Sequence, residues 1–180
     1  MSHPSAPTRC RVPTPFRRDL LIIGNGEDLL SSEFVPAARA RARKPSDALL
    51  AEAWAQVEAY FARRLTRFDL PLALFGTAFQ VEAWRAVAAL AFGEFVSYAD
   101  VARAIGKPLA HRGVAAAMAK TTIDLFVPAH RVVGADGRIK GAGPRSMRRY
   151  LAEFELARAP GSRRRRRVRW SLPRIAFDKR

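Results

Sequence analysis

Cysteine is nearly absent from this chain of 180 residues, and so are the glycine patterns that bind nucleotides. One cysteine, Cys10, cannot form an internal disulfide framework, and with only three histidines it makes a poor set of metal ligands. No apolar run approaches the roughly 20 residues that span a bilayer. The first fifteen residues show no secretory signal, and the chain has no P-loop and no dinucleotide fingerprint. These absences favour a soluble cytoplasmic protein without membrane contact, metal or cofactor.

Acidic residues are also scarce, with 16 against 32 lysines and arginines, which gives a formal net charge of +16. The excess is uneven: residues 156–180 hold ten basic side chains and one acidic one, and residues 163–167 are an unbroken arginine run. Such a run attracts polyanions such as DNA, or serves only as a solubility tail. We expect residues 1–15 and 157–180 to be disordered basic tails.

Hydrophobic patterning predicts a small first lobe over residues 16–75. The apolar run 20–23, the Gly-Asn-Gly turn at 24–26 and the run ending at Val35 predict a hairpin of two strands. An N-cap at Ser46 and apolar residues at helical spacing up to Leu65 predict one amphipathic helix. The signals before Gly76 break this pattern, so a second lobe begins there.

The second lobe, residues 76–156, is mainly helical. After a predicted helix at 79–92, Ser97 and Asp100 have capping-box spacing and open a short helix to Ile105. A glycine-containing connection leads to a helix at 109–119, which is the pattern of a helix-turn-helix or of an αα corner without a role in DNA binding. A strand-like run at 123–127 and a helix from Ser146 to Glu155 follow. The fold class is therefore α/β, of the α+β kind.

Several blocks of the second lobe together resemble the active-site domain of the O6-alkylguanine-DNA alkyltransferases. The blocks are Trp84-Arg85, Val96-Ser97-Tyr98, Arg112-Gly113-Val114, Val127-Pro128-Ala129-His130-Arg131-Val132-Val133-Gly134 and the helix that closes at Glu155. The first lobe resembles the shorter N-terminal domain of the bacterial members, so the resemblance covers residues 16–156. It implies a monomer that binds double-stranded DNA and needs no cofactor.

One position departs decisively from this family: Ala129 stands where the family carries the cysteine that accepts the alkyl group. Alkyl transfer from guanine needs a thiolate, and a methyl side chain has no electron pair to donate. The chain is thus most similar to the alkyltransferase-like proteins, which bind alkylated guanine without repairing it. The resemblance implies a sensor that hands O6-alkylguanine in duplex DNA to nucleotide excision repair proteins. Two alternatives stay open: an active or artificially inactivated alkyltransferase, with Cys10 as a displaced acceptor, and a helix-turn-helix transcription factor.

The resemblance also assigns the DNA-binding residues. Tyr98 matches the tyrosine that helps rotate the target nucleotide out, and Arg112 matches the arginine that fills the space it leaves. The small residues Gly113 and Ala116 allow their helix to approach the minor groove closely. A half-buried core tyrosine and a surface arginine are the structural alternatives for the first two.

The same resemblance outlines a lesion pocket lined by Tyr98, Met118, Ala129 and Val132, although Met118 can equally be an ordinary core residue. His130 and Glu155 match the relay that draws the proton from the family's cysteine. With Ala129 at its end this relay has no terminus, so we expect no catalytic residue and a structural role for the pair.

Two further departures concern loops. Thr121-Thr122 replaces the usual Asn-Pro, which removes the asparagine that ties the hinge to the recognition helix. The glycine-rich lid after Lys140 continues into Pro144-Arg145, which puts its base contacts in doubt. Independent departures of this kind speak against a recent engineered change of cysteine to alanine.

Overall fold

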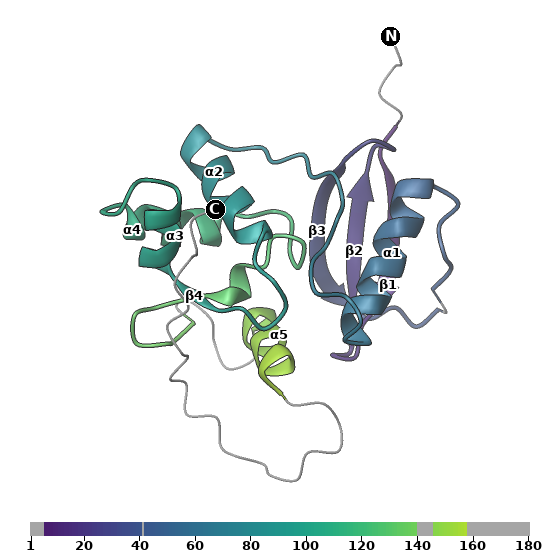
Figure 1. Ribbon diagram of the computed structural model, residues 1–180. Helices are drawn as coiled ribbons and strands as arrows, with labels where there is room; N and C mark the ends of the chain where they lie inside the picture. Colours follow the sequence, from purple (N-terminus) through teal and green to yellow (C-terminus); the bar gives the residue numbers. More distant parts are fainter. Residues whose placement is uncertain (1–5, 41, 140–145, 158–180) are drawn as a thin grey trace. The chain divides into compact units, whose positions relative to one another are not determined.

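A computed structural model describes residues 6–40, 42–139 and 146–157 and divides the chain into two compact units (Figure 1). Unit 1 comprises Met1–Thr77 with Thr121–Val127, and unit 2 comprises Ala78–Lys120 with Pro128–Arg180. The division after residue 77 falls near the predicted lobe boundary, but residues 121–127, which the sequence places in the second lobe, group with unit 1. The predicted lid at 140–145 and the basic tail from 158 lie outside the described residues.

Unit 1 is built on an antiparallel sheet in the order β1-β2-β3, formed by Thr8–Pro13, Arg18–Gly24 and Leu29–Pro36. The predicted hairpin is confirmed as β2 and β3. Its turn is closed by Asn25, whose Oδ1 accepts hydrogen bonds from the amides of Glu27 (3.0 Å) and Asp28 (2.7 Å). The asparagine side chain therefore replaces a backbone acceptor in the turn.

Strand β1 corrects the expectation that residues 1–15 are disordered. It pairs with β2 along its whole length, and its side chains alternate, with Cys10 and Val12 buried and Arg9 exposed. Alternation with a period of two is the sequence signal of a half-buried strand. Pro7 before this strand, Pro13 at its end and the surrounding polar residues obscured that signal.

Helix α1 (Ala48–Phe61) packs on β1 and β2 (Figure 1). It begins one residue later than predicted, because Asp47 rather than Ser46 is the N-cap and accepts a hydrogen bond from the Leu50 amide at 2.8 Å. The helix buries Trp54 and Val57 on the side that carries Leu50. These residues supply the core of unit 1 together with the apolar side chains of β2.

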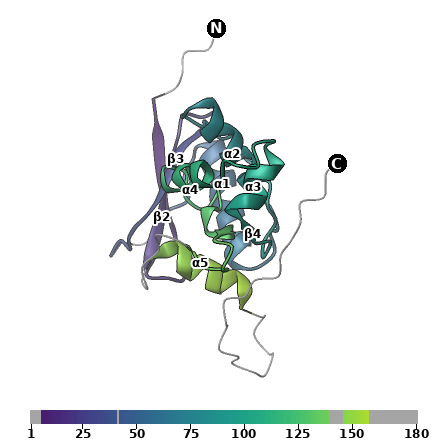
Figure 2. The ribbon, with the colours of Figure 1, turned by 90° about the vertical axis from the view of Figure 1, so that its left-hand side faces the viewer.

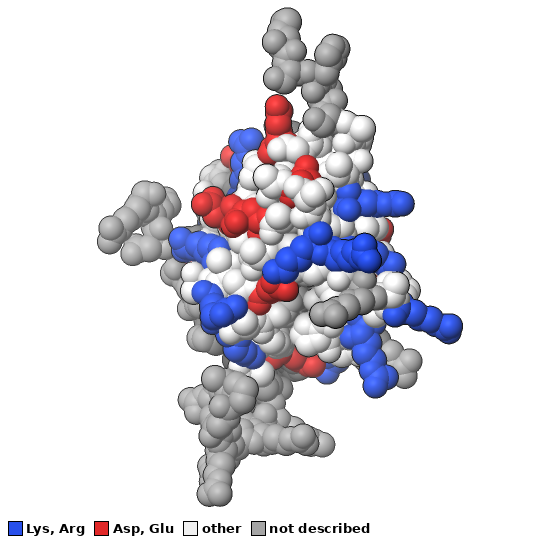
Figure 3. All heavy atoms as spheres, turned by 90° about the vertical axis from the view of Figure 1, so that its right-hand side faces the viewer, with Lys and Arg blue, Asp and Glu red and all other residues white. Residues whose placement is uncertain are grey.

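The face of unit 1 that carries α1 mixes basic and acidic side chains (Figure 3). One such pair joins Lys44 to Glu58 at 3.3 Å. The basic charges on this face of unit 1 are therefore partly compensated by acidic ones. An exposed ion pair such as Lys44–Glu58 contributes little to stability.

Residues 121–127 do not form the regular strand that their apolar run predicts. Isolated bridges pair Ser32 with Ile123 and Asp124 with Val127, and Ser32 Oγ donates a hydrogen bond to the Asp124 carbonyl at 2.7 Å. Leu125 has φ of 71°, in the left-handed region, which interrupts strand geometry. The segment is thus an irregular extension against β3.

Unit 2 confirms the predicted helices, although the first ends earlier than expected. It contains α2 (Ala78–Ala88), α3 (Tyr98–Ala104), α4 (His111–Ala119), α5 (Met147–Leu156), the 3-10 turn η1 (Ala129–Arg131) and the parallel pair β4 (Val96–Ser97) and β5 (Val132–Val133). Helices α3 and α4 lie side by side, as a helix-turn-helix requires (Figure 1, Figure 2). The predicted α+β class is confirmed.

Candidate nucleic-acid interface

Tyr98 is held at the first position of α3 by the predicted capping box. Ser97 Oγ accepts a hydrogen bond from the Asp100 amide at 3.1 Å, and Asp100 Oδ2 accepts one from the Ser97 amide at 2.8 Å. Tyr98 is 8% exposed, and burial raises the pKa of its phenol. The hydroxyl therefore stays protonated at neutral pH and is available as a hydrogen-bond donor.

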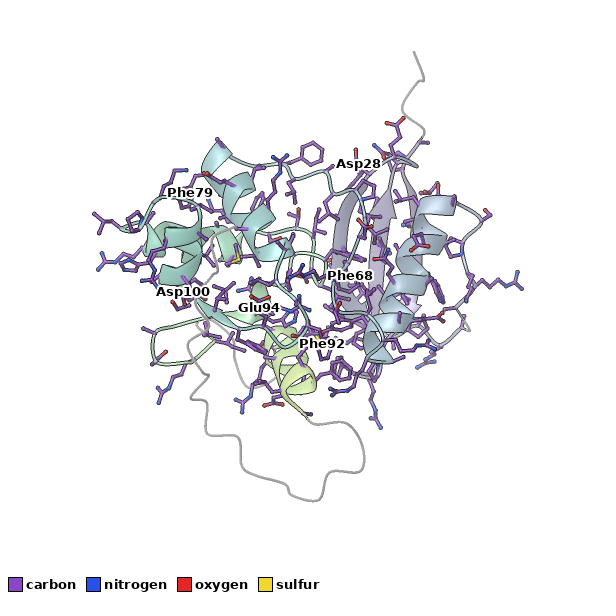
Figure 4. All side chains as sticks on the ribbon, viewed as in Figure 1. Asp28, Phe68, Phe79, Phe92, Glu94 and Asp100 are labelled. Atoms are coloured by element: carbon purple, nitrogen blue, oxygen red, sulfur yellow. The ribbon has the colours of Figure 1, made fainter. Side chains whose placement is uncertain are left out.

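The turn from α3 to α4 is a Schellman motif. Gly106 has φ of 71°, its amide donates to the Arg103 carbonyl at 3.0 Å, and the Lys107 amide donates to the Ala102 carbonyl at 2.8 Å. The ammonium of Lys107 lies 5.7 Å from the ring centroid of Phe79, which Figure 4 labels on α2. Backbone and side-chain contacts both fix the start of α4.

Helix α4 exposes Arg112 and Ala116, four residues apart on one face, and buries Val114 and Met118 on the other. Its N-cap, Ala110, provides no side-chain hydrogen bond, so the first-turn amides keep the partial positive charge of a helix N-terminus. The guanidinium of Arg112 lies in this same turn. The exposed face of α4 is therefore positively charged and free of bulky groups near its middle.

Gly113 lies half-buried on α4. A Cβ atom at this position would meet the ring of Phe79. The packing of α4 on α2 thus gives this glycine an internal role. Its predicted approach to DNA stays a prediction.

Side chains from α2 and α5 tie down the C-terminal end of α4. Trp84 Nε1 donates to the Ala117 carbonyl at 2.9 Å, and Arg148 Nη2 donates to the Met118 carbonyl. Arg148 was not singled out by sequence reasoning, but it lies two helical turns before Glu155 on the same face of α5, which was the available signal. The last carbonyl groups of a helix have no intrahelical donor, and these two side chains supply donors for them.

The hinge that follows α4 uses different partners from the asparagine of the usual pattern. Thr121 Oγ1 accepts a hydrogen bond from the Ile123 amide at 3.4 Å, and the Thr122 carbonyl accepts one from the Ser32 amide at 3.0 Å. Both bonds lie within unit 1. The hinge is therefore held by its own hydroxyl and by the main chain of β3.

Ala129 opens η1 with 6% exposure and directly precedes His130, whose Nε2 lies 2.8 Å from Glu155 Oε1. Burial lowers the pKa of His130, and although Glu155 opposes this shift, the nearby guanidinium of Arg131 adds to it. Burial alone would raise the pKa of Glu155, but hydrogen bonds from His130 and Arg131 hold it well below its usual range. The ring is thus neutral, with Nε2–H donating to the carboxylate and a lone pair on Nδ1.

Arg131 completes this buried cluster, although sequence reasoning assigned no role to it beyond the motif. Its Nε and Nη2 donate to Glu155 at 3.0 and 2.9 Å, and its Nη1 donates to the Leu90 carbonyl at 2.5 Å. The Gly93 amide adds a hydrogen bond of 2.9 Å to the same carboxylate. The cluster anchors the loop that leads from α2 to β4, where Figure 4 labels Phe92 and Glu94.

The one cysteine of the chain lies in β1 of unit 1. Cys10 is 7% exposed, and burial, reinforced by the charge of Asp47, raises the pKa of its thiol to about 11. At neutral pH it is therefore a protonated thiol and a poor nucleophile. Among the described residues, no group of histidine, cysteine, aspartate or glutamate is placed to bind a metal ion, and no helix could cross a membrane.

Residues 78–157 match the family model described as 6-O-methylguanine DNA methyltransferase, DNA binding domain, and residues 13–74 match the ribonuclease-like domain of the same family. The chain belongs to the O6-methylguanine-DNA methyltransferase family. The resemblance predicted from the motifs is confirmed, and residues 78–157 are the DNA-binding domain of a protein from a DNA repair family.

Relatives of this methyltransferase-family chain are similar over most of their length. The methylated-DNA–protein-cysteine methyltransferase of Mycobacterium leprae is 37% identical over 140 residues, which are 76% of this chain and 84% of the relative. The protein of the same name from Methanosarcina barkeri is 36% identical over 142 residues, 76% and 89% of the two chains.

Solved structures of the family agree with the fold. The Mycobacterium tuberculosis O6-methylguanine methyltransferase aligns with a TM-score of 0.70 and 32% identity, covering 87% of this chain and 97% of the other. The Mycobacterium tuberculosis protein OGT in complex with DNA aligns with a TM-score of 0.68 and 35% identity, covering 84% and 94%.

The four residues assigned to the lesion pocket all lie in unit 2 of this methyltransferase-family member and are all buried. Met118 and Val132 are fully enclosed, whereas Ala129 and Tyr98 retain 6% and 8% exposure. The Val132 amide donates to the Ala129 carbonyl, and the pairing of Val96 with Val132 places the strand that leads into Tyr98 beside Val132. The structure thus brings η1, β5 and the start of α3 together. The role of the four residues as a pocket stays a prediction.

Proposed function

We propose that this family member recognises O6-alkylguanine in duplex DNA by nucleotide flipping and does not accept the alkyl group. The observation that carries the proposal is Ala129, which directly precedes a buried and hydrogen-bonded His130–Glu155 pair. The groups that would activate a nucleophile are present, but the side chain at the acceptor position has no lone pair. The chain can then hold an alkylated base but cannot remove its alkyl group.

The exposed face of α4 supports the DNA-binding part of the proposal. Phosphates are attracted by Arg112 and by the uncapped helix N-terminus, and the small Ala116 lets the helix approach the groove. Tyr98 then assists rotation of the nucleotide, and Arg112 fills the space that it leaves. Flipping costs a few kcal/mol, and less for a base already paired badly because of its alkyl group, which gives selectivity for damage.

The fate of the lesion follows from the missing acceptor. A protein that holds alkylguanine without repairing it contributes to repair only by recruiting another system. We therefore place this chain in the cytoplasm, on the nucleoid when bound to DNA, upstream of nucleotide excision repair proteins.

The enzyme alternative requires another acceptor, and Cys10 is unsuited because it is buried in β1 of unit 1 and protonated at neutral pH. The transcription-factor alternative predicts one preferred operator and no preference for damage.

A single pair of measurements tests the proposal. The full chain is incubated with duplex DNA carrying O6-methylguanine labelled in its methyl group, and its affinity is compared for matched damaged and undamaged duplexes. We expect no label on the protein and tighter binding to the damaged duplex. Stoichiometric label on the protein, or equal affinity for the two duplexes, would overturn the proposal.

A further inference from the structure

The turn before α4 carries an apolar side chain that is exposed to solvent. Leu109 is 92% exposed, and of the described large hydrophobic residues only Phe75, at 73%, is also exposed. We infer that Leu109 is a second wedge, which enters the minor groove beside Arg112 and separates neighbouring bases when α4 binds DNA. The inference rests on the proposed function and extends it to a residue that neither the family motifs nor the relay explains.

No internal packing role accounts for this leucine. It occupies the position before the N-cap Ala110, where an apolar residue often packs against the fourth residue of the helix, here Val114. Val114 is fully buried while Leu109 is 92% exposed, so this contact is absent. The helix therefore gains nothing from a leucine rather than a polar residue at this position.

The turn presents Leu109 at a fixed point. Besides the Schellman bonds at Gly106, the Ala110 amide donates to the Lys107 carbonyl at 2.9 Å, and the Lys107 side chain pairs with Glu82 of α2. The ring of Pro108 fixes the backbone angle immediately before Leu109. A backbone that is already fixed loses little entropy on binding, which favours insertion of the side chain that it carries.

The charges around Leu109 select DNA as the occupant. Arg112 is exposed three residues after Leu109, and α4 has no acidic residue in its first turn, whereas Arg103 pairs with Asp100 of α3. An apolar tip beside the Arg112 cation matches the minor groove, where phosphates flank an accessible base stack and apolar side chains act as wedges. A protein partner with an apolar pocket would not need this neighbouring arginine.

The position of the wedge also gives it a task. Leu109 precedes Arg112 by three residues at the same end of α4, so both side chains reach the same stretch of the groove. Unstacking by Leu109 beside the target lowers the energy needed to extrude the nucleotide that Arg112 replaces. The pair would share the work of flipping.

The test uses the full chain and a duplex with O6-methylguanine and with 2-aminopurine at the neighbouring base step, because 2-aminopurine fluoresces more strongly when unstacked. We expect Leu109→Ala to weaken binding about tenfold, the effect of losing the burial of most of a leucine side chain, and to abolish most of the fluorescence increase. Leu109→Met keeps an apolar wedge and should preserve both signals. Phe75→Ala is the matched control, because it removes an exposed apolar side chain of unit 1 and should change neither.

The outcomes separate this inference from the proposed function. If the wild-type chain prefers damaged DNA but Leu109→Ala keeps its affinity or its fluorescence increase, the wedge is wrong and the proposed function stands. If the wild-type chain shows no preference for damage, the proposed function is wrong, and the wedge inference that rests on it is wrong as well. Because Leu109 is almost wholly exposed, loss of folding in the alanine variant is not expected, and a thermal melt of each variant checks this.

Discussion

A Cβ atom added at Gly113 would lie 3.0 Å from Cζ and 3.1 Å from Cε1 of Phe79. These distances are shorter than ordinary carbon–carbon contacts, so the ring of Phe79 on α2 sets how closely α4 packs. The helix proposed to enter DNA is therefore positioned by a contact between a glycine and an aromatic ring within unit 2.

The first prediction concerns this contact. Gly113→Ala gains about 0.5–1 kcal/mol of helix propensity but crowds a ring, and overpacking typically costs about 1–3 kcal/mol. We expect a net loss of about 1 kcal/mol in the free energy of unfolding, measured by urea denaturation. In a Phe79→Leu background the clash is relieved, and the same substitution should become stabilising. An equal destabilisation in both backgrounds would show that Phe79 is not the obstacle.

The second prediction concerns the acceptor position. Ala129→Cys places a thiol directly before the neutral His130, and the proton can pass to its Nδ1 while Glu155 holds Nε2. We expect this variant to take up about one labelled methyl group per chain from O6-methylguanine DNA. Ala129→Ser is the control, because a hydroxyl stays protonated and should remain unlabelled. A cysteine variant that binds damaged DNA yet stays unlabelled would show that the base is not held at position 129.

The third prediction compares two neighbouring arginines of α5. Arg148→Ala leaves the Met118 carbonyl at the end of α4 without its donor, which should cost about 1–3 kcal/mol of stability. Arg149 pairs with Glu153 at 2.9 Å on the exposed face, and Arg149→Ala should cost at most about 0.5 kcal/mol. Urea denaturation of the two variants gives the comparison. Similar losses would mean that the bond to Met118 does not stabilise α4.

Much of unit 2 was predictable from the sequence because its signals are local. The capping box at Ser97 and Asp100 fixes the start of α3 within a few residues, and the block around Ala129 and His130 carries the family assignment. The clustering of Arg131 on Glu155 was not predictable, because it depends on where η1 and α5 meet in space.

Two segments of unit 1 show the opposite case, although its hairpin and its helix were predicted. Strand β1 owes its order to pairing with β2, and its own sequence, rich in proline and arginine, resembles a tail. The apolar run at 123–127 reads as a strand, but the positive φ of Leu125 interrupts it. Long-range pairing and a single unusual backbone angle are not encoded in local periodicity.

The fourth prediction is a pH dependence of stability that originates at His130. Burial lowers the pKa of this histidine below its ordinary 6.5, so below that pH the unfolded chain binds a proton that the folded chain does not. The free energy of unfolding should therefore fall as the pH drops through 6.5, by up to about 1.4 kcal/mol per pH unit for one proton. Glu155 acts in the same direction at lower pH. Its pKa is lowered in the folded chain, so its contribution is complete above its ordinary value of 4.5 and is lost as the pH falls further.

Urea denaturation between about pH 5 and pH 8 measures this slope. His130→Gln keeps an amide donor for Glu155 but does not titrate. The decrease in the free energy of unfolding below pH 6.5 should therefore be smaller by the contribution of one proton. His111→Gln is the matched control, because it makes the same substitution at an exposed histidine of α4 outside the buried cluster. An unchanged slope in His130→Gln would mean that the folded and unfolded chains take up the histidine proton over the same pH range, and the lowered pKa of His130 would then be wrong.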